Sequence, residues 1–179
     1  MRAGAPEAPN NDALRAVSGK VPLLPGRWDV ALAPTAGYCL VGFTPPQADA
    51  ADQGRSDGWN EILLAAGSQN VVKFVLSSAP STLTGTVKDA SGDAVAGVPV
   101  FIEPYDLDPR KRIAEVRSTR TNAQGQYSVG GLAPGAYRLL GTFDYQMPSP
   151  AEMEEAHAKT VKVEEGSSAV LDLEEYAIH

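Results

Sequence analysis

Short runs in which apolar and polar residues alternate fill the chain between residues 81 and 175, and turn-forming residues separate them. The runs lie at residues 83–88, 98–103, 113–121, 126–130, 136–143, 160–164 and 169–173. Because the side chains of a strand point alternately to two faces, each run predicts a strand with one buried face. Seven short strands at this spacing predict an all-β fold, a seven-stranded β-sandwich.

The same alternation assigns residues to the core. The apolar faces of these runs carry Val98, Val100, Ile102, Tyr127, Val129, Tyr137, Leu139 and Phe143. We expect these side chains to share the interior, because burying apolar surface is the main favourable contribution to folding. We also expect the last two strands to form a hairpin, closed by the turn at residues 165–167.

One helix is predicted at residues 150–158, in the connection that precedes the last two strands. Ser149 suits the N-cap, Pro150 fits the first helical position, and Glu152 follows three residues after the cap. This arrangement is a capping box, in which the Ser and Glu side chains satisfy backbone N–H groups at the start of a helix. We therefore expect a single short helix in the sandwich.

Residues 21–80 show the alternation less regularly. Strands are predicted at residues 27–33, 38–44, 59–64 and 70–77. The segment between the second and third of these, residues 45–58, predicts a long exposed loop because it lacks periodicity. Residues 1–20 are small and polar and predict a flexible N-terminal tail.

Two motifs of this first part recur later in the chain in the same order. Residues 23–30 and 132–139 both follow the pattern L-x-P-G-x-aromatic-x-apolar, and residues 66–72 resemble 165–171 around a Gly-Ser turn. The recurrence predicts an internal repeat of which the first part holds only the C-terminal half, so we expect a fragment of a longer protein. The predicted division is a tail at 1–20, a partial β-sandwich module at 21–80, and a β-sandwich at 81–179.

Charge and composition argue against several classes of function. The chain carries 15 basic and 22 acidic residues, a net charge of −7, so it should repel the phosphate backbone of nucleic acids. No apolar run approaches the length of a membrane-spanning helix, and the first residues lack the apolar core of a signal peptide. The single cysteine, Cys39, leaves no partner for an intrachain disulfide.

Residues of the second part, taken in order, resemble the carboxypeptidase regulatory-like domain. Residues 83–103 (LTGTVKDASGDAVAGVPVFIE) provide the G-x-V strand, the D-x-x-G turn and the second strand of its pattern. Residues 119–137 provide the continuation, T-x-x-x-G-x-Y followed by L-x-P-G-x-Y. The resemblance implies an immunoglobulin-like or transthyretin-like (prealbumin-like) sandwich that is an accessory to other domains.

The same resemblance implies a setting for the protein. Such domains are typical of large exported or cell-envelope bacterial proteins, which places this one outside the cytoplasm, in the periplasm, at the outer membrane or in the secreted fraction. The family takes its name from its position beside a peptidase domain. The zinc ligands of that domain have no matching segment here, so peptidase activity is not implied.

Residue types that bind metals are present, but not at the spacing of a site. The candidate ligands are His157, His179, Cys39, Asp89, Asp93, Asp106 and Asp108. The histidines and the cysteine are too few for a zinc cluster at familiar spacing. The aspartates stand where turns need them and lack the ligand order of a calcium loop. We predict no metal and no cofactor.

Nucleophiles and acid–base groups are not grouped either. Cys39 lies in a predicted strand without a nearby histidine or basic residue, so we expect a buried and unreactive thiol. Lys88 lies on the polar face of its strand, which disfavours an intramolecular Lys–Asn bond. Acidic side chains in a predicted helix and a predicted turn are expected to be exposed to solvent. They are Glu152, Glu154, Glu155, Glu164 and Glu165. We predict no catalytic residues and no enzymatic activity.

These observations favour a non-catalytic structural or protein-interaction module, whose partners are neighbouring modules or another protein. The alternative is a carbohydrate-binding module that uses exposed loop aromatics, with Tyr105 as the exposed candidate and Trp59 expected in the core. An enzymatic function would require a cleft lined by titratable groups near residues 45–60. A set of basic residues could bind an acidic partner, although such side chains are ordinarily just exposed to solvent. The set comprises Arg110, Lys111, Arg112, Arg117 and Arg120.

Overall fold

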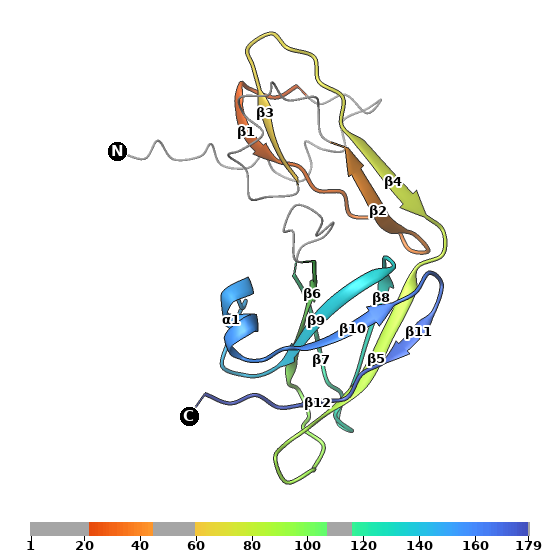
Figure 1. Ribbon diagram of the computed structural model, residues 1–179, viewed down its shortest axis with the longest axis vertical. Coiled ribbons are helices and arrows are strands. Elements are labelled where there is room, and N and C mark those ends of the chain that lie inside the picture. Colours follow the sequence, from red (N-terminus) through yellow and green to blue (C-terminus); the bar gives the residue numbers. More distant parts are fainter. Residues whose placement is uncertain (1–21, 45–59, 107–115, 179) are drawn as a thin grey trace.

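The computed structural model describes residues 22–44, 60–106 and 116–178. In these residues the chain forms β-strands and one short helix, so the predicted all-β fold class is confirmed. Figure 1 shows two groups of strands, one above the other along the long axis of the molecule. We call the strands within residues 22–77 the first unit and the elements within residues 81–174 the sandwich.

The sandwich contains two sheets. One holds β6 (Pro99–Pro104), β7 (Arg117–Arg120), β9 (Gly135–Gly141) and β10 (Lys159–Val163). These strands are antiparallel, in the order β10-β9-β6-β7. The other sheet has β5 (Ser81–Lys88) at its centre, with β8 (Gln126–Leu132) antiparallel on one side. On the other side β11 (Ser168–Val170) and β12 (Leu173–Glu174) run parallel to β5.

The main core lies between the two sheets. Its buried side chains are Leu83, Val87, Val98, Val100, Ile102, Tyr127, Val129, Leu132, Tyr137, Leu139, Val163 and Leu173. The alternation in the sequence therefore predicted the inward faces, with one exception. Phe143 is 54% exposed, because β9 ends at Gly141 and Phe143 lies in the loop that follows.

The turn at residues 165–167 does not close a hairpin, so that prediction is wrong. β10 pairs with β9 in one sheet, whereas β11 pairs with β5 in the other, and the turn carries the chain across the sandwich. The start of β5 holds this turn, since the Ser81 hydroxyl donates to Glu164 O (2.5 Å) and accepts from Ser167 N (3.3 Å). Turn residues are of the same kinds in hairpins and in crossings, so the local sequence could not separate the two.

α1 (Pro150–Glu155) packs on the outer face of the sheet β10-β9-β6-β7 and begins with the predicted capping box. Ser149 Oγ accepts from Glu152 N (3.3 Å), and the Glu152 carboxylate accepts from Ser149 N (2.6 Å). The helix ends before residue 158 because His157 adopts a left-handed φ of 51°. A second core on this face consists of Phe101, Leu140, Met153 and Ala156.

The first unit consists of two antiparallel pairs of strands. β1 (Gly26–Asp29) pairs with β3 (Glu61–Leu64), and β2 (Cys39–Thr44) pairs with β4 (Lys73–Ser77). The four predicted strands of this part are present, each shorter than predicted. The predicted tail at 1–20 and the predicted loop at 45–58 lie outside the described residues, as does Trp59.

The recurring P-G motif has the same geometry in the first unit and in the sandwich. Its glycine opens a strand and lies opposite the last residue of the paired strand, Gly26 opposite Leu64 and Gly135 opposite Val163. The aromatic residue that follows donates to the carbonyl four residues back in both copies. Trp28 Nε1 donates to Leu24 O at 2.9 Å, and the Tyr137 hydroxyl donates to Ala133 O at 2.8 Å.

The recurring Gly-Ser turn is also alike in both places. The hydroxyls of Ser68 and Ser167 each donate to the carbonyl oxygen three residues back, at 2.7 Å in both cases. The strands that follow differ in their pairing, because β4 is antiparallel to β2 whereas β11 is parallel to β5. The division of the chain after residues 20 and 80 stays a prediction.

The first unit and the sandwich are joined by hydrogen bonds as well as by the chain. Ser77 Oγ donates to the Glu165 carboxylate (2.8 Å), and Gly166 N donates to Ala79 O (3.0 Å). Both bonds connect the end of β4 and the residues just after it to the turn between β10 and β11. The short connection between the two units is therefore fixed on the end of the sandwich.

Candidate functional site

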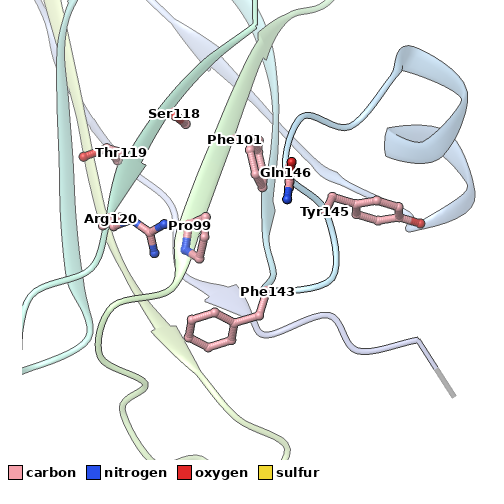
Figure 2. Close-up of a pocket in the computed structure, with 8 residues that line it drawn as sticks. All are labelled: Pro99, Phe101, Ser118, Thr119, Arg120, Phe143, Tyr145 and Gln146. Atoms are coloured by element: carbon pink, nitrogen blue, oxygen red, sulfur yellow. The ribbon is translucent and has the colours of Figure 1, made fainter.

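A groove lies on the outer face of the β6–β7 pair, where the cover provided by α1 ends (Figure 2). Its volume is about 600 Å³. The described residues that line it come from β6, β7 and the loop after β9; they are Pro99, Phe101, Ser118, Thr119, Arg120, Phe143, Tyr145 and Gln146.

Strand register determines which side chains reach the groove. Val100 and Ile102 belong to the main core, so their neighbours Pro99 and Phe101 point to the outer face of the sheet. Directly paired residues of antiparallel strands share a face, and Pro99 pairs with Arg120 as Phe101 pairs with Ser118. Sequence positions about twenty residues apart are thereby brought onto one surface.

The loop that forms the opposite wall is held by hydrogen bonds. Thr142 N donates to Pro99 O (3.0 Å), and the Thr142 hydroxyl accepts from Asp144 N (3.0 Å). The Asp144 carboxylate in turn accepts from Ile178 N (2.8 Å) near the C-terminal end of the described chain. The groove is therefore largely formed before any ligand arrives.

The two aromatic residues of this wall differ in exposure. The Tyr145 ring stacks on Tyr176, with centroids 6.3 Å apart and planes at 10°. Desolvation raises the pKa of the Tyr145 hydroxyl, and neighbouring Tyr176 adds to the rise. The Phe143 ring is 54% exposed, and Figure 2 shows it projecting from the loop below Pro99. Phe143 is the aromatic surface of the groove that a ligand can reach.

Arg120 is the one charged side chain among the described lining residues. Its Nη1 donates to Gly97 O at 2.8 Å, which orients the guanidinium on the sheet. A guanidinium has five N–H donors, so most of its donors stay available for a ligand. The described lining residues include no carboxylate, imidazole or thiol.

The structure places the predicted aromatic candidates elsewhere. Tyr105 is half-buried, and the guanidinium carbon of Arg138 lies 4.8 Å from the centre of its ring. It contributes to a wider crevice of about 920 Å³ between residues 31–41 and the turn between β8 and β9. Tyr105 is therefore half-buried and not the exposed platform that the sequence predicts, because Arg138 covers one face of its ring.

Arg138 is a buried cation that sequence reasoning missed. Its Nε and Nη2 donate to Glu103 Oε2 at 2.9 and 2.6 Å, and Nη1 donates to Glu154 Oε2 at 2.5 Å. Nη2 also donates to Pro150 O (3.1 Å), so the cluster fastens α1 to β6 and β9. The sequence feature that could have indicated this burial is the pair of consecutive leucines at 139–140. Apolar residues that do not alternate with polar ones indicate a strand buried on both faces.

The predicted set of basic residues does not form one surface among the residues that the structure describes. Arg110, Lys111 and Arg112 lie outside them. Arg117 donates to Gly130 O (2.8 Å) and Gly131 O (3.4 Å) across the edge of the sandwich, while Arg120 faces the groove.

The remaining candidates have structural surroundings. Cys39 is fully buried, and burial, followed by the charge of Glu165, raises the pKa of its thiol. Asp89 accepts from Ser91 N and Asp93 N, both at 2.9 Å, as a turn residue does. Lys88 is exposed at the end of β5. Among the described residues, no group of three or more His, Cys, Asp or Glu side chains could hold a metal; Asp108, His179 and most of the segment 45–60 lie outside them.

Comparison with known families identifies one match. Residues 82–174 match the family described as the carboxypeptidase regulatory-like domain, which is more than half of the chain. The matched segment spans the two sheets of the sandwich and the loop of the groove. No curated protein sequence matches the chain.

Solved structures of low sequence identity also resemble the chain. The Bacillus anthracis TIE protein is 17% identical over 65% of this chain and 21% of its own, with a TM-score of 0.37. BcpA, the major pilin subunit of Bacillus cereus, is 14% identical over 59% of this chain and 34% of its own, with a TM-score of 0.36. The Pseudomonas aeruginosa protein PA1324, for which carbohydrate binding has been suggested, is 17% identical over 54% of this chain and 88% of its own, with a TM-score of 0.37.

The chain spans only 21% and 34% of the length of the first two of these proteins. At such TM-scores and identities, these structures carry no argument about the function of this chain.

Proposed function

Because the chain belongs to the carboxypeptidase regulatory-like domain family, we propose that it is a non-catalytic structural or protein-interaction module of a larger exported bacterial protein. The observation that carries the proposal is the fixed, end-to-end arrangement of the first unit and the sandwich (Figure 1). A module that spaces or presents other parts needs a defined orientation toward its neighbour, and two β units joined without a flexible linker meet this need.

The contacts at the junction support a defined orientation. Ser77 and Ala79 are hydrogen-bonded to the turn at Glu165 and Gly166, at 2.8 and 3.0 Å. The connection between β4 and β5 is only a few residues long and contains Pro80, which restricts its backbone further. Neighbouring modules of the same protein are the partners that such a connection favours, and a separate protein partner is the other.

The proposal includes a location outside the cytoplasm. No helix among the described residues is long and apolar enough to cross a membrane. The test is to tag the chromosomal gene in the source bacterium and fractionate the cells, with protease added to intact cells in parallel. We expect the tagged protein in the envelope or the medium and accessible to protease. A protein found only in the cytoplasm would contradict the proposal.

The same strain tests for partners. Cross-linking in intact cells, followed by mass spectrometry, should join this chain to neighbouring modules of its own polypeptide or to one envelope protein. Turnover of a substrate that depends on residues of the described groove or crevice would instead show an enzyme.

A second candidate function, carbohydrate binding, is favoured by the groove of Figure 2. The aromatic residue that supports it is Phe143 in place of Tyr105, because Phe143 is exposed and Tyr105 is covered by Arg138. A panel of polysaccharides separates the two functions. Binding that is lost in Phe143→Ala would show a carbohydrate-binding module, and no retention on any polysaccharide would leave the structural function alone.

A further inference from the structure

The groove between β6, β7 and the loop after β9 combines an exposed aromatic ring with a single cation. We propose that it binds an acidic saccharide, one whose sugar ring packs on Phe143 and whose carboxylate pairs with Arg120. The proposal rests on the second candidate function and adds to it the chemical class of the ligand.

The position of the groove on a sheet face favours a compact ligand over an extended peptide. β6 lies between β9 and β7, so its backbone N–H and C=O groups are already used in both directions. A peptide strand that binds by sheet extension needs free backbone groups at an edge. The outer side of β7 is such an edge, but the groove lies on the face of the sheet, where β6 offers none. Recognition in the groove must therefore use side chains, which suits rings and their substituents.

Phe143 supplies the surface for a ring. Large apolar side chains are ordinarily buried, and this one is 54% exposed on a loop that hydrogen bonds hold in place. The apolar C–H face of a pyranose can pack against an aromatic face, as other flat apolar groups do. Because the loop is already ordered, binding costs little further conformational entropy.

Arg120 supplies the selection for charge. The chain has a net charge of −7, so an acidic ligand is repelled by most of its surface. At the groove the one charged group among the described lining residues is a guanidinium, oriented by its bond to Gly97 O. Guanidinium and carboxylate groups form paired, charge-assisted hydrogen bonds, which distinguish a uronic acid from a neutral sugar.

The other polar groups of the groove fit sugar hydroxyls. Ser118 offers a hydroxyl that donates and accepts, and Gln146 offers an amide that does both. The volume of about 600 Å³ lies within the usual range of small-molecule sites. A short oligosaccharide with at least one carboxylate is the ligand that these groups accommodate together.

The test compares one oligosaccharide in two charge states. The complete chain, labelled with ¹⁵N, is titrated with trigalacturonic acid and, separately, with its fully methyl-esterified form. We expect the acid to shift the amide signals of residues 100–101, 118–120 and 143–146. We expect the ester, in which a neutral methyl ester replaces each carboxylate, to bind about tenfold more weakly, because the carboxylate that pairs with Arg120 is lost.

Two variants and their matched controls locate the site. Phe143→Ala and Arg120→Gln should each weaken binding of the acid by about tenfold. Met147→Ala removes an exposed apolar side chain of the same loop that does not line the groove, and Lys162→Gln removes an exposed cation from β10. Neither control should change the affinity. Thermal unfolding of all four variants shows that they are folded.

Each other outcome overturns a stated part of the proposal. Equal binding of the acid and the ester, with no effect of Arg120→Gln, would reject the acidic ligand and keep carbohydrate binding. Shifts that appear only outside the groove would reject the site. No shift with either form at millimolar concentration would reject the inference, while the polysaccharide panel decides the second candidate function separately. A hexaglutamate peptide that binds as tightly as the trisaccharide would reject a saccharide as the preferred ligand.

Discussion

At the residue scale, Gly85 marks a close approach of two backbone segments in the sandwich. A Cβ at this position would lie 1.8 Å from Leu171 O and 2.9 Å from Tyr127 Cε1. The chain between β11 and β12 therefore runs beside β5 at a distance that only a residue without a side chain allows.

We predict that Gly85→Ala lowers the free energy of unfolding by about 3 kcal/mol, because the segment at Leu171 would have to move away from β5. Urea denaturation followed by far-ultraviolet circular dichroism measures this change. Gly130→Ala in β8 is the matched control, since its Cβ would meet nothing closer than 3.7 Å. That substitution should change stability by no more than about 0.5 kcal/mol. Equal effects of the two substitutions would contradict the close approach.

The buried Arg138 is the second residue whose surroundings lead to a prediction. Arg138→Ala should cost about 3–5 kcal/mol, because the Glu103 carboxylate would stay buried without the guanidinium. Glu154→Gln should cost under about 1 kcal/mol, because the Glu154 side chain is 75% exposed.

A double substitution separates charge from packing at the same place. Arg138→Met combined with Glu103→Leu removes both charges and keeps apolar bulk, so its stability should lie much closer to that of the unaltered protein than Arg138→Ala does. Thermal or urea denaturation of the unaltered protein, Arg138→Ala and the double variant compares their stabilities. A double variant as unstable as Arg138→Ala would show that the ion pair itself is required.

At the scale of elements, β11 and β12 are fastened to β5 by the side chain between them. Asp172 Oδ1 accepts from Thr86 N (2.8 Å) and Thr86 Oγ1 (2.7 Å). These two hydrogen bonds, the hydroxyl one first, lower the pKa of the Asp172 carboxyl.

The lowered pKa predicts a loss of stability in acid. A carboxyl whose pKa is lower in the folded than in the unfolded state stabilises the fold above the unfolded value, about 3.9. That contribution disappears as the pH falls through the lower, folded value. The difference in melting temperature between the unaltered protein and Asp172→Asn should therefore be full at pH 5 and shrink below about pH 4. A difference that stays constant down to pH 2 would contradict the assignment.

The elements were predictable from sequence where one face of a strand is exposed. Alternation predicted seven strands in the sandwich, and the structure has a strand in each predicted range, but the last range is divided into β11 and β12. The Ser149–Glu152 pair predicted the helix. Alternation did not predict that both faces of β6 and β9 are buried. Their outer faces are covered by α1, so Glu103 and Arg138 are buried as well. The prediction also failed at residues 165–167, because a turn does not reveal which strand will be paired next.

The groove could not be predicted for a related reason. Phe143 was assigned to the core because alternation was continued past the end of β9, and Arg120 was one of five basic residues in a loosely defined group. Their proximity depends on the register between β6 and β7 and on the bond from Thr142 N to Pro99 O. Both are long-range pairings that leave no local sign in the sequence.

At the scale of the whole molecule, the side-chain bond at the junction should set how firmly the two units hold one orientation. Replacing both Ser77 and Glu165 by Ala removes this bond, together with the bond from Ala79 N to Ser77 Oγ (3.2 Å), and leaves the backbone bond from Gly166 to Ala79. We expect a broader distribution of distances between the units, because one of the two described hydrogen-bonded links is gone.

Double electron–electron resonance measures this distribution. The spin labels are attached to cysteines introduced at the exposed positions Val71 and Val170, in a protein in which Cys39 is replaced by Ser. Ser68→Ala is the control, since that serine bonds within its own turn in the first unit. An unchanged width in the double variant would show that the side-chain bond is dispensable for orientation.

The parallel pairing of β5 with β11 and β12 has a mechanical consequence. β5 is the first strand of the sandwich and β12 the last, and they are joined by bonds that include Leu171 N to Thr84 O (2.9 Å) and Glu175 N to Lys88 O (2.7 Å). Tension applied to the two ends of the sandwich pulls these parallel strands past each other. The hydrogen bonds between them are then loaded together in shear, so the strands must slide as a set instead of peeling apart one bond at a time.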